Sequence, residues 1–285
     1  MTGEPTIAAI ILTKDEERDL PGCLQSLEGV TSELYLIDSG STDRTVQIAT
    51  EFGAQVLTHE FVNYASQFNW ALDNIRTAAE WILRIDADER LSAELREELK
   101  QTLPKLAQDV TGLLVPRRVQ FLGRRLRWGD TYPVWLLRLW RNGKGRCEDT
   151  SMDEHIVLTG GQVCKIRGDL IHVIPKSLTD WISKHNWYAS RECNDLLGRQ
   201  ADAPGDLAGP AGRKRWLKRH VYLRLPLFLR AFLYWLYRYV VKLGFLDGKE
   251  GLMYHFLQGF WYRFLVDAKL FETEKTGAGA SSARL

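Results

Sequence analysis

Residues 81–89 read WILRIDADE, a short apolar run that ends in two aspartates separated by one residue. The run from Trp81 to Asp86 has the length of a strand and is almost unbroken by polar residues, which is typical of a strand buried on both faces of a sheet. Asp86 and Asp88 therefore stand just past a buried strand. Such a pair is either a solvated turn or a place where a ligand is held, and the sequence on either side favours the second.

Three more apolar runs of strand length precede this one: Thr6–Thr13 (TIAAIILT), Glu33–Ser39 (ELYLIDS) and Ala54–His59 (AQVLTH). The segments between them suit helices, near residues 16–28, 43–53 and 65–79. Ser41-Thr42-Asp43 offers an N-cap for the second helix, and Gly53 offers its stop. This alternation of strands and helices predicts an α/β fold with a parallel sheet. In such sheets the ligand binds beyond the carboxyl ends of the strands.

Polar clusters follow three of the predicted strands: Thr13-Lys14-Asp15-Glu16, Asp38-Ser39-Gly40-Ser41-Thr42-Asp43 and Asp86-Ala87-Asp88-Glu89. We expect them to converge on one edge of the sheet. There, two carboxylates at the spacing of Asp86 and Asp88 can place one toward a divalent cation and the other toward a ribose or a water. Gly40 permits a tight turn into the next helix. Asp38 is expected to be an unpaired acid that points into the cleft toward a nucleobase or ribose.

These three motifs, in this order and at these separations, resemble the nucleotide-binding half of family 2 glycosyltransferases of GT-A fold. The resemblance covers roughly residues 5–115. Tyr64–Leu72 (YASQFNWAL) is similar to a segment of the branch that includes lipopolysaccharide-core β-glucosyltransferases and related exopolysaccharide enzymes. One departure is Asp15, where asparagine is common in the family.

The resemblance implies an inverting transfer from a nucleotide sugar, most simply one linked to UDP, with Mg²⁺ or Mn²⁺ as cofactor. The nucleotide-binding residues that it implies are Thr13, Lys14, Glu16, Asp38, Gln67, Asn69, Asp86 and Ala87. The metal ligands that it implies are Asp86 and Asp88. An acceptor hydroxyl needs a separate carboxylate as general base.

For that base we favour Glu154, with Asp153 next, in the stretch Asp153-Glu154-His155. The alternative is that this stretch is only a charged loop, and Asp130 is a weaker candidate. The possible acceptor or phosphate contacts are His155, Lys184 and His185. His172 is expected to be a structural histidine.

The C-terminal part differs in composition from the rest. Residues 213–275 hold 13 Lys+Arg against 5 Asp+Glu and 16 of the 31 aromatic residues. We expect a catalytic domain at 1–175, a helix and linker at 176–212, basic aromatic helices at 213–275 and a disordered tail at 276–285. On a helix over Pro226–Lys242, a stripe formed by Arg230, Arg238 and Lys242 would leave a wide apolar face.

Such a basic, aromatic helix is typical of one that lies in the headgroup plane of a membrane. The alternative is that these helices pack on the catalytic domain or form a homo-oligomer interface. No stretch reaches the roughly 18 uncharged residues that a spanning helix needs, so we expect peripheral contact at the cytoplasmic face of the inner membrane. A lipid-linked glycan would then be the acceptor.

Composition excludes other classes. A formal net charge of +2 argues against a nucleic-acid partner. The four cysteines are widely spaced with no CxxC pair, which indicates neither a zinc site nor a disulfide framework. Two alternatives stay open: transfer to a polyprenyl phosphate, which needs no base, and a non-catalytic membrane scaffold that kept a nucleotide-binding fold.

Overall fold

The computed structural model describes residues 5–148, 155–174, 177–198, 216–218 and 220–277, which fall into two compact units. The sheet unit is formed by residues up to 125 and by residues 131–175, and the helical unit by residues 126–130 and everything from 176 onward. The chain thus passes between the two units three times. Outside the described residues lie Asp153, Glu154, residues 199–212 of the expected helix and linker, and residues 278–285 of the expected tail at 276–285.

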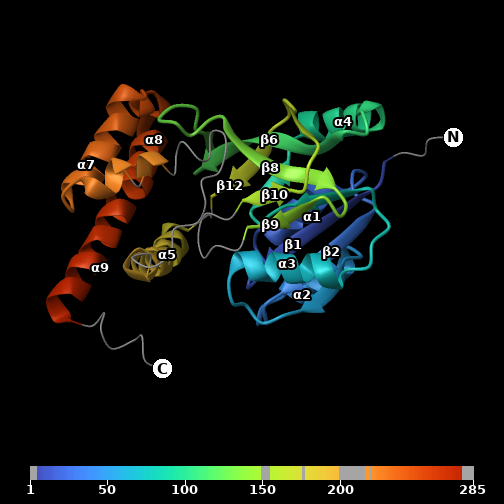
Figure 1. Ribbon diagram of the computed structural model, residues 1–285, viewed down its shortest axis with the longest axis horizontal. Coiled ribbons are helices and arrows are strands. Elements are labelled where there is room, and N and C mark those ends of the chain that lie inside the picture. Colours follow the sequence, from blue (N-terminus) through green and yellow to red (C-terminus); the bar gives the residue numbers. More distant parts are fainter. Residues whose placement is uncertain (1–4, 149–154, 175–176, 199–215, 219, 278–285) are drawn as a thin grey trace. The chain divides into compact units, whose positions relative to one another are not determined.

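The sheet unit is built on a ten-stranded sheet in the order β3-β2-β1-β4-β8-β6-β12-β5, with β7 and β11 also pairing with β6 (Figure 1). Its strands are β1 (Ile7–Thr13), β2 (Glu33–Asp38), β3 (Gln55–Thr58), β4 (Trp81–Arg84), β5 (Glu89–Leu91), β6 (Val110–Phe121), β7 (Arg124–Arg125), β8 (Val134–Arg141), β11 (Gln162–Lys165) and β12 (Leu170–Val173). The first four strands are parallel, and β8 runs antiparallel to both β4 and β6. A separate hairpin joins β9 (Gly145–Cys147) to β10 (Ile156–Leu158).

Helices cover both faces of this sheet. On one face lie α1 (Leu20–Leu27), α2 (Thr45–Glu51) and α4 (Ala93–Thr102), packed on alternate β1 residues such as Ile7 and Ile11. On the other lie α3 (Tyr64–Asn74) and the β9–β10 hairpin, packed on Ala8 and Ile10. Because both sets of β1 side chains are buried, the strand carries no polar alternation. The predicted α/β fold is confirmed.

Local signals set the helix ends much as expected. Gly53, at φ +77°, stops α2, and Asp43 accepts a hydrogen bond from Thr45 N (2.9 Å) at its start. A capping box of Asn63 and Ser66 begins α3. The first helix starts at Leu20, four residues later than expected. Residues 16–19 form a turn instead, in which Glu16 O accepts hydrogen bonds from Asp19 N and Leu20 N.

The helical unit contains α5 (Leu178–Gly198), α7 (Leu229–Leu236), α8 (Gly248–Tyr254) and α9 (Tyr262–Thr276). Wider π-helical turns follow α7 (Tyr237–Val241) and precede α9 (His255–Trp261). Its core lies where α5 packs on α9, around Ala189, Cys193, Tyr262, Val266 and Leu270. None of the helices in the described ranges is long and apolar enough to cross a membrane.

The expected basic stripe of the helix over residues 226–242 is wrong for two of its three members. Arg230 and Arg238 are buried inside the helical unit, and only Lys242 is exposed. The reason is that each guanidinium has an internal partner: Arg230 Nε donates to Asp267 Oδ1 (2.7 Å), and Arg238 Nε donates to Gly129 O (2.7 Å). The charged side of this helix therefore faces inward.

Residues 126–130, which stand between β7 and β8 in sequence, are held within the helical unit. The Asp247 carboxylate accepts hydrogen bonds from the backbone N–H groups of Arg127 (3.0 Å) and Trp128 (2.9 Å). Gly129 N donates to Lys242 O (2.8 Å). A Cβ on Gly129 would lie 2.0 Å from the His255 ring, so no larger residue fits there without rearrangement.

Candidate active site

The polar clusters after β1, β2 and β4 lie side by side at the carboxyl edge of the sheet, as predicted. Thr13 pairs with Asp38 at the ends of β1 and β2, and Ile10 pairs with Arg84 at the end of β4. Strand order places β1 between β2 and β4. All three loops therefore leave the same edge, where ligands of open α/β sheets bind.

The loops after β1 and β2 are joined by their own side chains. Asp15 N donates to Ser41 Oγ (2.9 Å), and Asp15 Oδ1 accepts from Thr42 N (2.7 Å). Lys14 Nζ donates to the carbonyl oxygens of Ser39 (3.3 Å) and Gly40. Asp15 also has a φ of +53°, in the left-handed region that aspartate tolerates better than most residues. The residue that departs from the family pattern thus ties the two loops together.

Asp38 is not the unpaired acid that the sequence predicted. Its side chain is buried and accepts hydrogen bonds from Gly40 N (2.9 Å), Ser41 N (2.8 Å) and Thr13 Oγ1 (3.4 Å). An aspartate at a strand end that bonds to N–H groups two and three residues ahead stabilises its own turn. The buried side chains of Asp38 and Thr13 therefore stabilise the backbone at this edge of the sheet.

Gln67 and Asn69, predicted to contact the nucleotide, also have partners within the fold. Gln67 is buried, and its amide bonds Ser39 Oγ (3.0 Å) and the His59 ring nitrogen Nδ1 (2.7 Å). Asn69 both donates to Cys147 O (2.9 Å) and accepts from Cys147 N (2.9 Å), as a β-strand neighbour would. These polar residues of α3 fasten the helix to β2, β3 and β9.

The turn after β4 carries the open carboxylates. The Asp86 side chain is 40% exposed, whereas Glu89 is fully buried and accepts from Asp86 N (3.1 Å). Arg138 of β8 is buried beside them and donates to Asp86 Oδ2 (2.8 Å) and Glu89 Oε1 (2.7 Å). One guanidinium therefore fixes the turn while the Asp86 side chain stays partly exposed.

Charge at this turn is set by burial and by that guanidinium. Burial opposes ionisation of Asp86, but Arg138 and Arg84 outweigh it and hold the pKa of the carboxyl well below its usual range. For Glu89, complete burial together with the nearby Asp86 and Asp88 charges raises the pKa despite Arg138. The surroundings of Asp86 therefore favour its ionised form, whereas those of Glu89 disfavour it.

Arg138 is a site residue that the sequence reasoning missed. It lies in Val134–Arg141 (VWLLRLWR), where a charged residue interrupts an apolar strand. A buried arginine needs an acidic partner. That lone charge was the available signal, and it could have been paired with the DADE turn.

Asp88 and Ala87 complete the turn. Ala87 is buried in the core. Asp88 Oδ2 lies 3.7 Å from His172 Nε2 of β12, and Asp88 O accepts from Val173 N (2.9 Å). His172, expected to be structural, stands beside the predicted metal ligand.

Asp86 and Asp88 fit a Mg²⁺ or Mn²⁺ site in which the protein and a bound diphosphate both supply ligands. Among the described residues, no group of three or more His, Cys, Asp or Glu is arranged to hold a metal by itself. Mg²⁺ is commonly held by one or two carboxylates together with substrate phosphates. Asp86 and Asp88 suit that mode, because they supply two carboxylates and leave the other positions to a diphosphate.

The other predicted contacts are scattered. His155 opens β10, and its carbonyl accepts from Glu148 N (2.8 Å) across the hairpin. Lys184 and His185 belong to α5 of the helical unit, where the His185 ring stacks on Trp181 at 3.5 Å between centroids. Asp130 is exposed, at a φ of +61°, in the 126–130 segment. His185 is thus part of an aromatic cluster.

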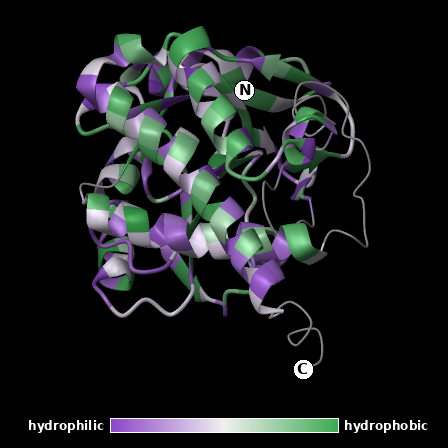
Figure 2. Ribbon diagram, turned by 90° about the vertical axis from the view of Figure 1, so that its left-hand side faces the viewer, coloured by the Kyte–Doolittle hydropathy of each residue, from purple (hydrophilic) through white to green (hydrophobic). Residues whose placement is uncertain are grey.

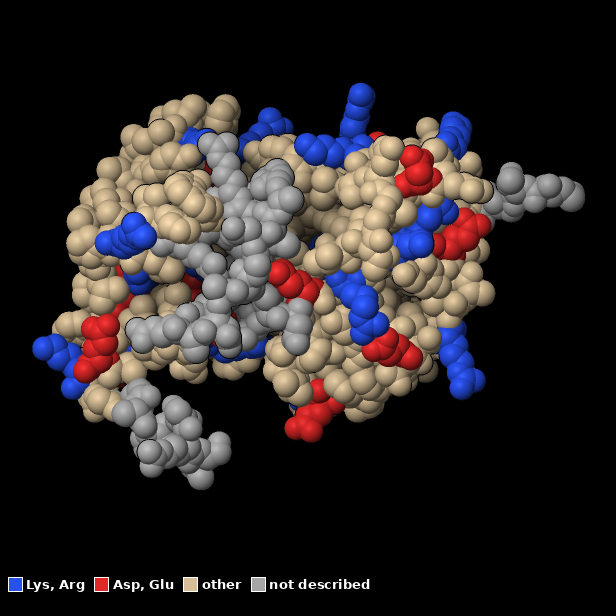
Figure 3. All heavy atoms as spheres, viewed as in Figure 1, with Lys and Arg blue, Asp and Glu red and all other residues tan. Residues whose placement is uncertain are grey.

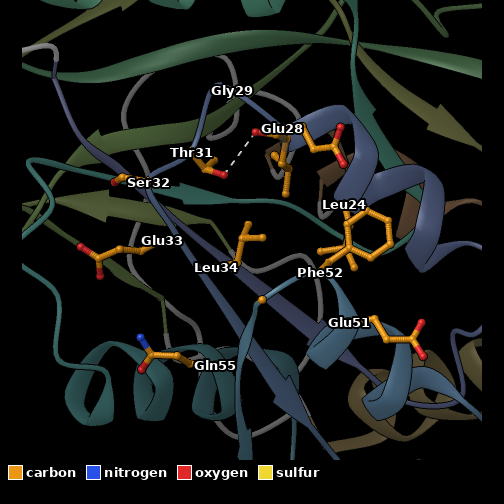
Figure 4. A pocket seen from close by; sticks show the side chains of 12 residues that line it. Leu24, Glu28, Gly29, Thr31, Ser32, Glu33, Leu34, Glu51, Phe52 and Gln55 are labelled. Atoms are coloured by element: carbon orange, nitrogen blue, oxygen red, sulfur yellow. Dashed lines mark hydrogen bonds between the residues drawn. The ribbon is translucent and has the colours of Figure 1, made fainter.

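A hollow of about 610 Å³ lies at the opposite edge of the sheet (Figure 4). It is bordered by the end of α1, the end of α2 and the start of β2, with Glu33, Leu34 and Phe52 on its walls. β2 begins at this hollow and ends with Asp38 at the carboxyl edge, where the acidic turn after β4 also lies. The hollow and the acidic turn are therefore at opposite ends of the parallel strands. It takes no part in the site above.

Comparison with known proteins places the chain in a family. The model of glycosyl transferase family 2 matches residues 8–160. The lipopolysaccharide core biosynthesis glycosyltransferase LpsC of Rhizobium meliloti (strain 1021) is 30% identical, over 67% of this chain and 72% of that protein. A glycosyltransferase of Rickettsia bellii (strain RML369-C) is 37% identical over 76% of each chain.

Among solved structures, S. aureus TarS 1-349 in complex with UDP aligns with a TM-score of 0.46 and 13% identity, over 95% of this chain and 92% of that one. The family match covers the strands from β1 to β10 except Ile7, the joined loops after β1 and β2, and the acidic turn after β4. The chain belongs to glycosyl transferase family 2 and is a glycosyltransferase.

Proposed function

We propose that the protein moves a sugar, with inversion, from a UDP-linked donor to a lipid-anchored glycan at the cytoplasmic face of a bacterial inner membrane. The observation that carries the donor half is the partly exposed Asp86 side chain, two residues from Asp88 in the turn at the carboxyl edge. The acceptor half is supported by the relative LpsC, whose name assigns it to lipopolysaccharide core biosynthesis.

On the donor side, each residue has a defined task. Asp88, with Asp86 beside it, would hold Mg²⁺ or Mn²⁺, which when bound supplies positive charge to the diphosphate leaving group. Arg138 keeps Asp86 ionised and fixed, so the pair is organised before the nucleotide arrives. Lys14 and Glu16, in the loop after β1, stand at the same edge as proposed nucleotide contacts.

On the acceptor side, Glu154 or Asp153 would remove the proton from the attacking hydroxyl. Residues 149–154 join β9 to β10 in sequence, and this hairpin is fastened to α3 by Asn69. A carboxylate base raises the rate of such transfers by about 10²- to 10⁴-fold. His155 is a proposed contact to the acceptor or to phosphate.

Calorimetry of UDP, GDP and dTDP binding, with and without Mn²⁺, tests the donor half. We expect UDP to bind only with metal, and Asp88→Ala to abolish that binding. Asp73→Ala removes an exposed acid of α3 and should bind UDP as the unchanged protein does. Metal-independent binding, or equal binding by both variants, would refute the assignment of Asp88.

Turnover of the variant carrying Asp153→Asn and Glu154→Gln tests the acceptor half. We expect a loss of at least about 10²-fold, because a hydroxyl acceptor needs a base. Unchanged turnover would instead favour a polyprenyl phosphate acceptor, which is already an anion.

A further inference from the structure

The outer surface of the helical unit is apolar. Eighteen of the 28 exposed large hydrophobic side chains in the described residues lie between Trp216 and Phe271. In Figure 2, hydrophobic residues (green) recur along the helices. We call the following part of it the apolar surface: Leu229, Phe232, Leu233, Leu236, Tyr237, Val240, Val241, Leu243, Phe245, Leu246, Leu252, Met253 and Phe256.

Several charged groups of these same helices are buried and paired within the unit. Arg230 pairs with the buried Asp267, whose second oxygen accepts from Phe228 N (2.7 Å). Glu192 of α5 accepts from Tyr262 (2.7 Å) and Arg263 (2.9 Å). A water-soluble helix pair has the reverse arrangement, with its apolar stripe inside and its charges outside. The unit is therefore suited to an apolar neighbour.

The fully exposed charged side chains along this stretch of the chain are basic. Among the described residues from 216 to 264, the exposed charged side chains are Arg224, Lys242 and Lys249. The two acids in that span are buried, as for Asp247, or half-buried, as for Glu250. In Figure 3 the surface over α7 and α8, at the upper left, carries few charged atoms. An apolar patch whose fully exposed charges are cationic complements an anionic lipid headgroup layer.

We infer that the apolar surface inserts into one leaflet of an anionic phospholipid bilayer. The eight residues of α7 extend only about 12 Å, so the helices lie in the interface plane with their apolar side chains below the headgroups. This revises the expected mode of contact, since Leu and Phe rather than Arg230 and Arg238 meet the membrane. A symmetric contact with a second copy would instead bring these exposed cationic side chains against their own copies, with no fully exposed acid in this described span to offset them.

Flotation of the full chain with vesicles tests the inference. We expect binding to vesicles of phosphatidylcholine with phosphatidylglycerol, and weaker binding to phosphatidylcholine alone. Joint substitution Val241→Asp and Leu246→Asp, at side chains that are exposed, should weaken binding to the anionic vesicles by at least about tenfold. The matched control is Val62→Asp with Val163→Asp, two exposed positions of the sheet unit, which should leave binding unchanged.

A second double variant tests the electrostatic contribution to vesicle binding. Lys242→Gln with Lys249→Gln should lower affinity for anionic vesicles by roughly 25-fold, at about 1 kcal/mol per charge, and leave binding to neutral vesicles unchanged. Circular dichroism confirms that each variant is folded.

Absence of vesicle binding by the unchanged protein would overturn the inference. So would a dimer in solution that the two aspartates convert to a monomer while vesicle binding persists, because a second copy would then cover the surface. The inference is separable from the transferase proposal: vesicle binding without UDP binding leaves it standing, and UDP binding without vesicle binding removes it alone.

Discussion

The sheet unit and the helical unit place their charges and their apolar side chains in opposite ways. Of the 28 exposed large hydrophobic side chains in the part of the chain that the structure describes, 22 belong to the helical unit and 6 to the sheet unit. Each unit also buries an arginine against acids, but Arg138 shares its acids with an exposed turn, whereas Arg230 and Asp267 are sealed. A buried ion pair is thus a functional feature only where one partner reaches solvent.

The largest effect is expected at Asp88, which belongs to the sheet unit alone. Asp88→Ala should lower transferase turnover by about 10²- to 10³-fold, as for loss of one group that stabilises developing charge. Vesicle binding by the same variant should be unchanged. Loss of both properties together would contradict the separation of tasks between the units, and parallel turnover and flotation assays measure it.

The two buried arginines sharpen the comparison. Arg138→Met and Arg230→Met should each destabilise the protein by about 3 to 5 kcal/mol, because each leaves buried carboxylate charge unpaired. Only Arg138→Met should also reduce turnover of the folded protein, by about 10- to 100-fold, since it orients a proposed metal ligand. Urea unfolding and assays at low temperature separate the two effects.

The companion variant Arg138→Lys keeps the charge but cannot reach both acids in the same way. It should recover much of the stability and less of the turnover. Equal recovery of both would indicate that Arg138 is only structural.

Acid should weaken the helical unit first. Burial lowers the pKa of His255 from 6.5 to about 3, and Arg263 and Lys218 outweigh burial to lower the pKa of Glu192 from 4.5 to about 2. Both groups bind fewer protons when folded, so the stability that His255 contributes is complete above pH 6.5 and is lost as pH falls toward 3. The stability that Glu192 contributes is lost in the same way as pH falls from 4.5 to 2.

Between pH 7 and pH 4.5 the loss from His255 should be about 2 to 3 kcal/mol. His255→Leu should flatten the dependence in this window, as urea midpoints at the two pH values would reveal. An unchanged slope in the variant would assign the pH dependence to other groups.

The smallest effect is expected at the surface of the sheet unit. Asp73 and Arg146 form a close bidentate pair, with distances of 2.6 and 2.8 Å, but both side chains are more than half exposed. Asp73→Ala should therefore cost less than about 1 kcal/mol, whereas Asp267→Ala should cost about 3 to 5 kcal/mol. Similar losses for the two would show that burial does not govern these pairs.

The sheet was predictable because its signals are local and agree with one another. Apolar runs, caps and Gly53 place the first strands and helices within a few residues, and parallel order then brings the acidic clusters together. The hydrogen-bond partners of single polar side chains were not predictable. Asp38, Gln67 and Asn69 have the composition of ligand contacts, yet each is taken by main-chain or side-chain partners that only the folded loops bring near.

The prediction of which side of the C-terminal helix faces outward failed for a related reason. A helical wheel identifies a charged stripe and an apolar stripe, but it cannot tell which one faces inward. Asp267 and Gly129, respectively 37 and 109 residues away in sequence, supply the partners that draw Arg230 and Arg238 into the interior.

The 126–130 segment has a consequence for how this protein can be dissected. Because the chain enters the helical unit at residue 126, returns at 131 and enters again at 176, no single cut separates the two units. A fragment that ends at residue 175 would leave the Arg127 and Trp128 N–H groups without Asp247, and would expose Leu126. A C-terminal helical region grafted onto this sheet unit from another protein would likewise have to supply an acid in the place of Asp247.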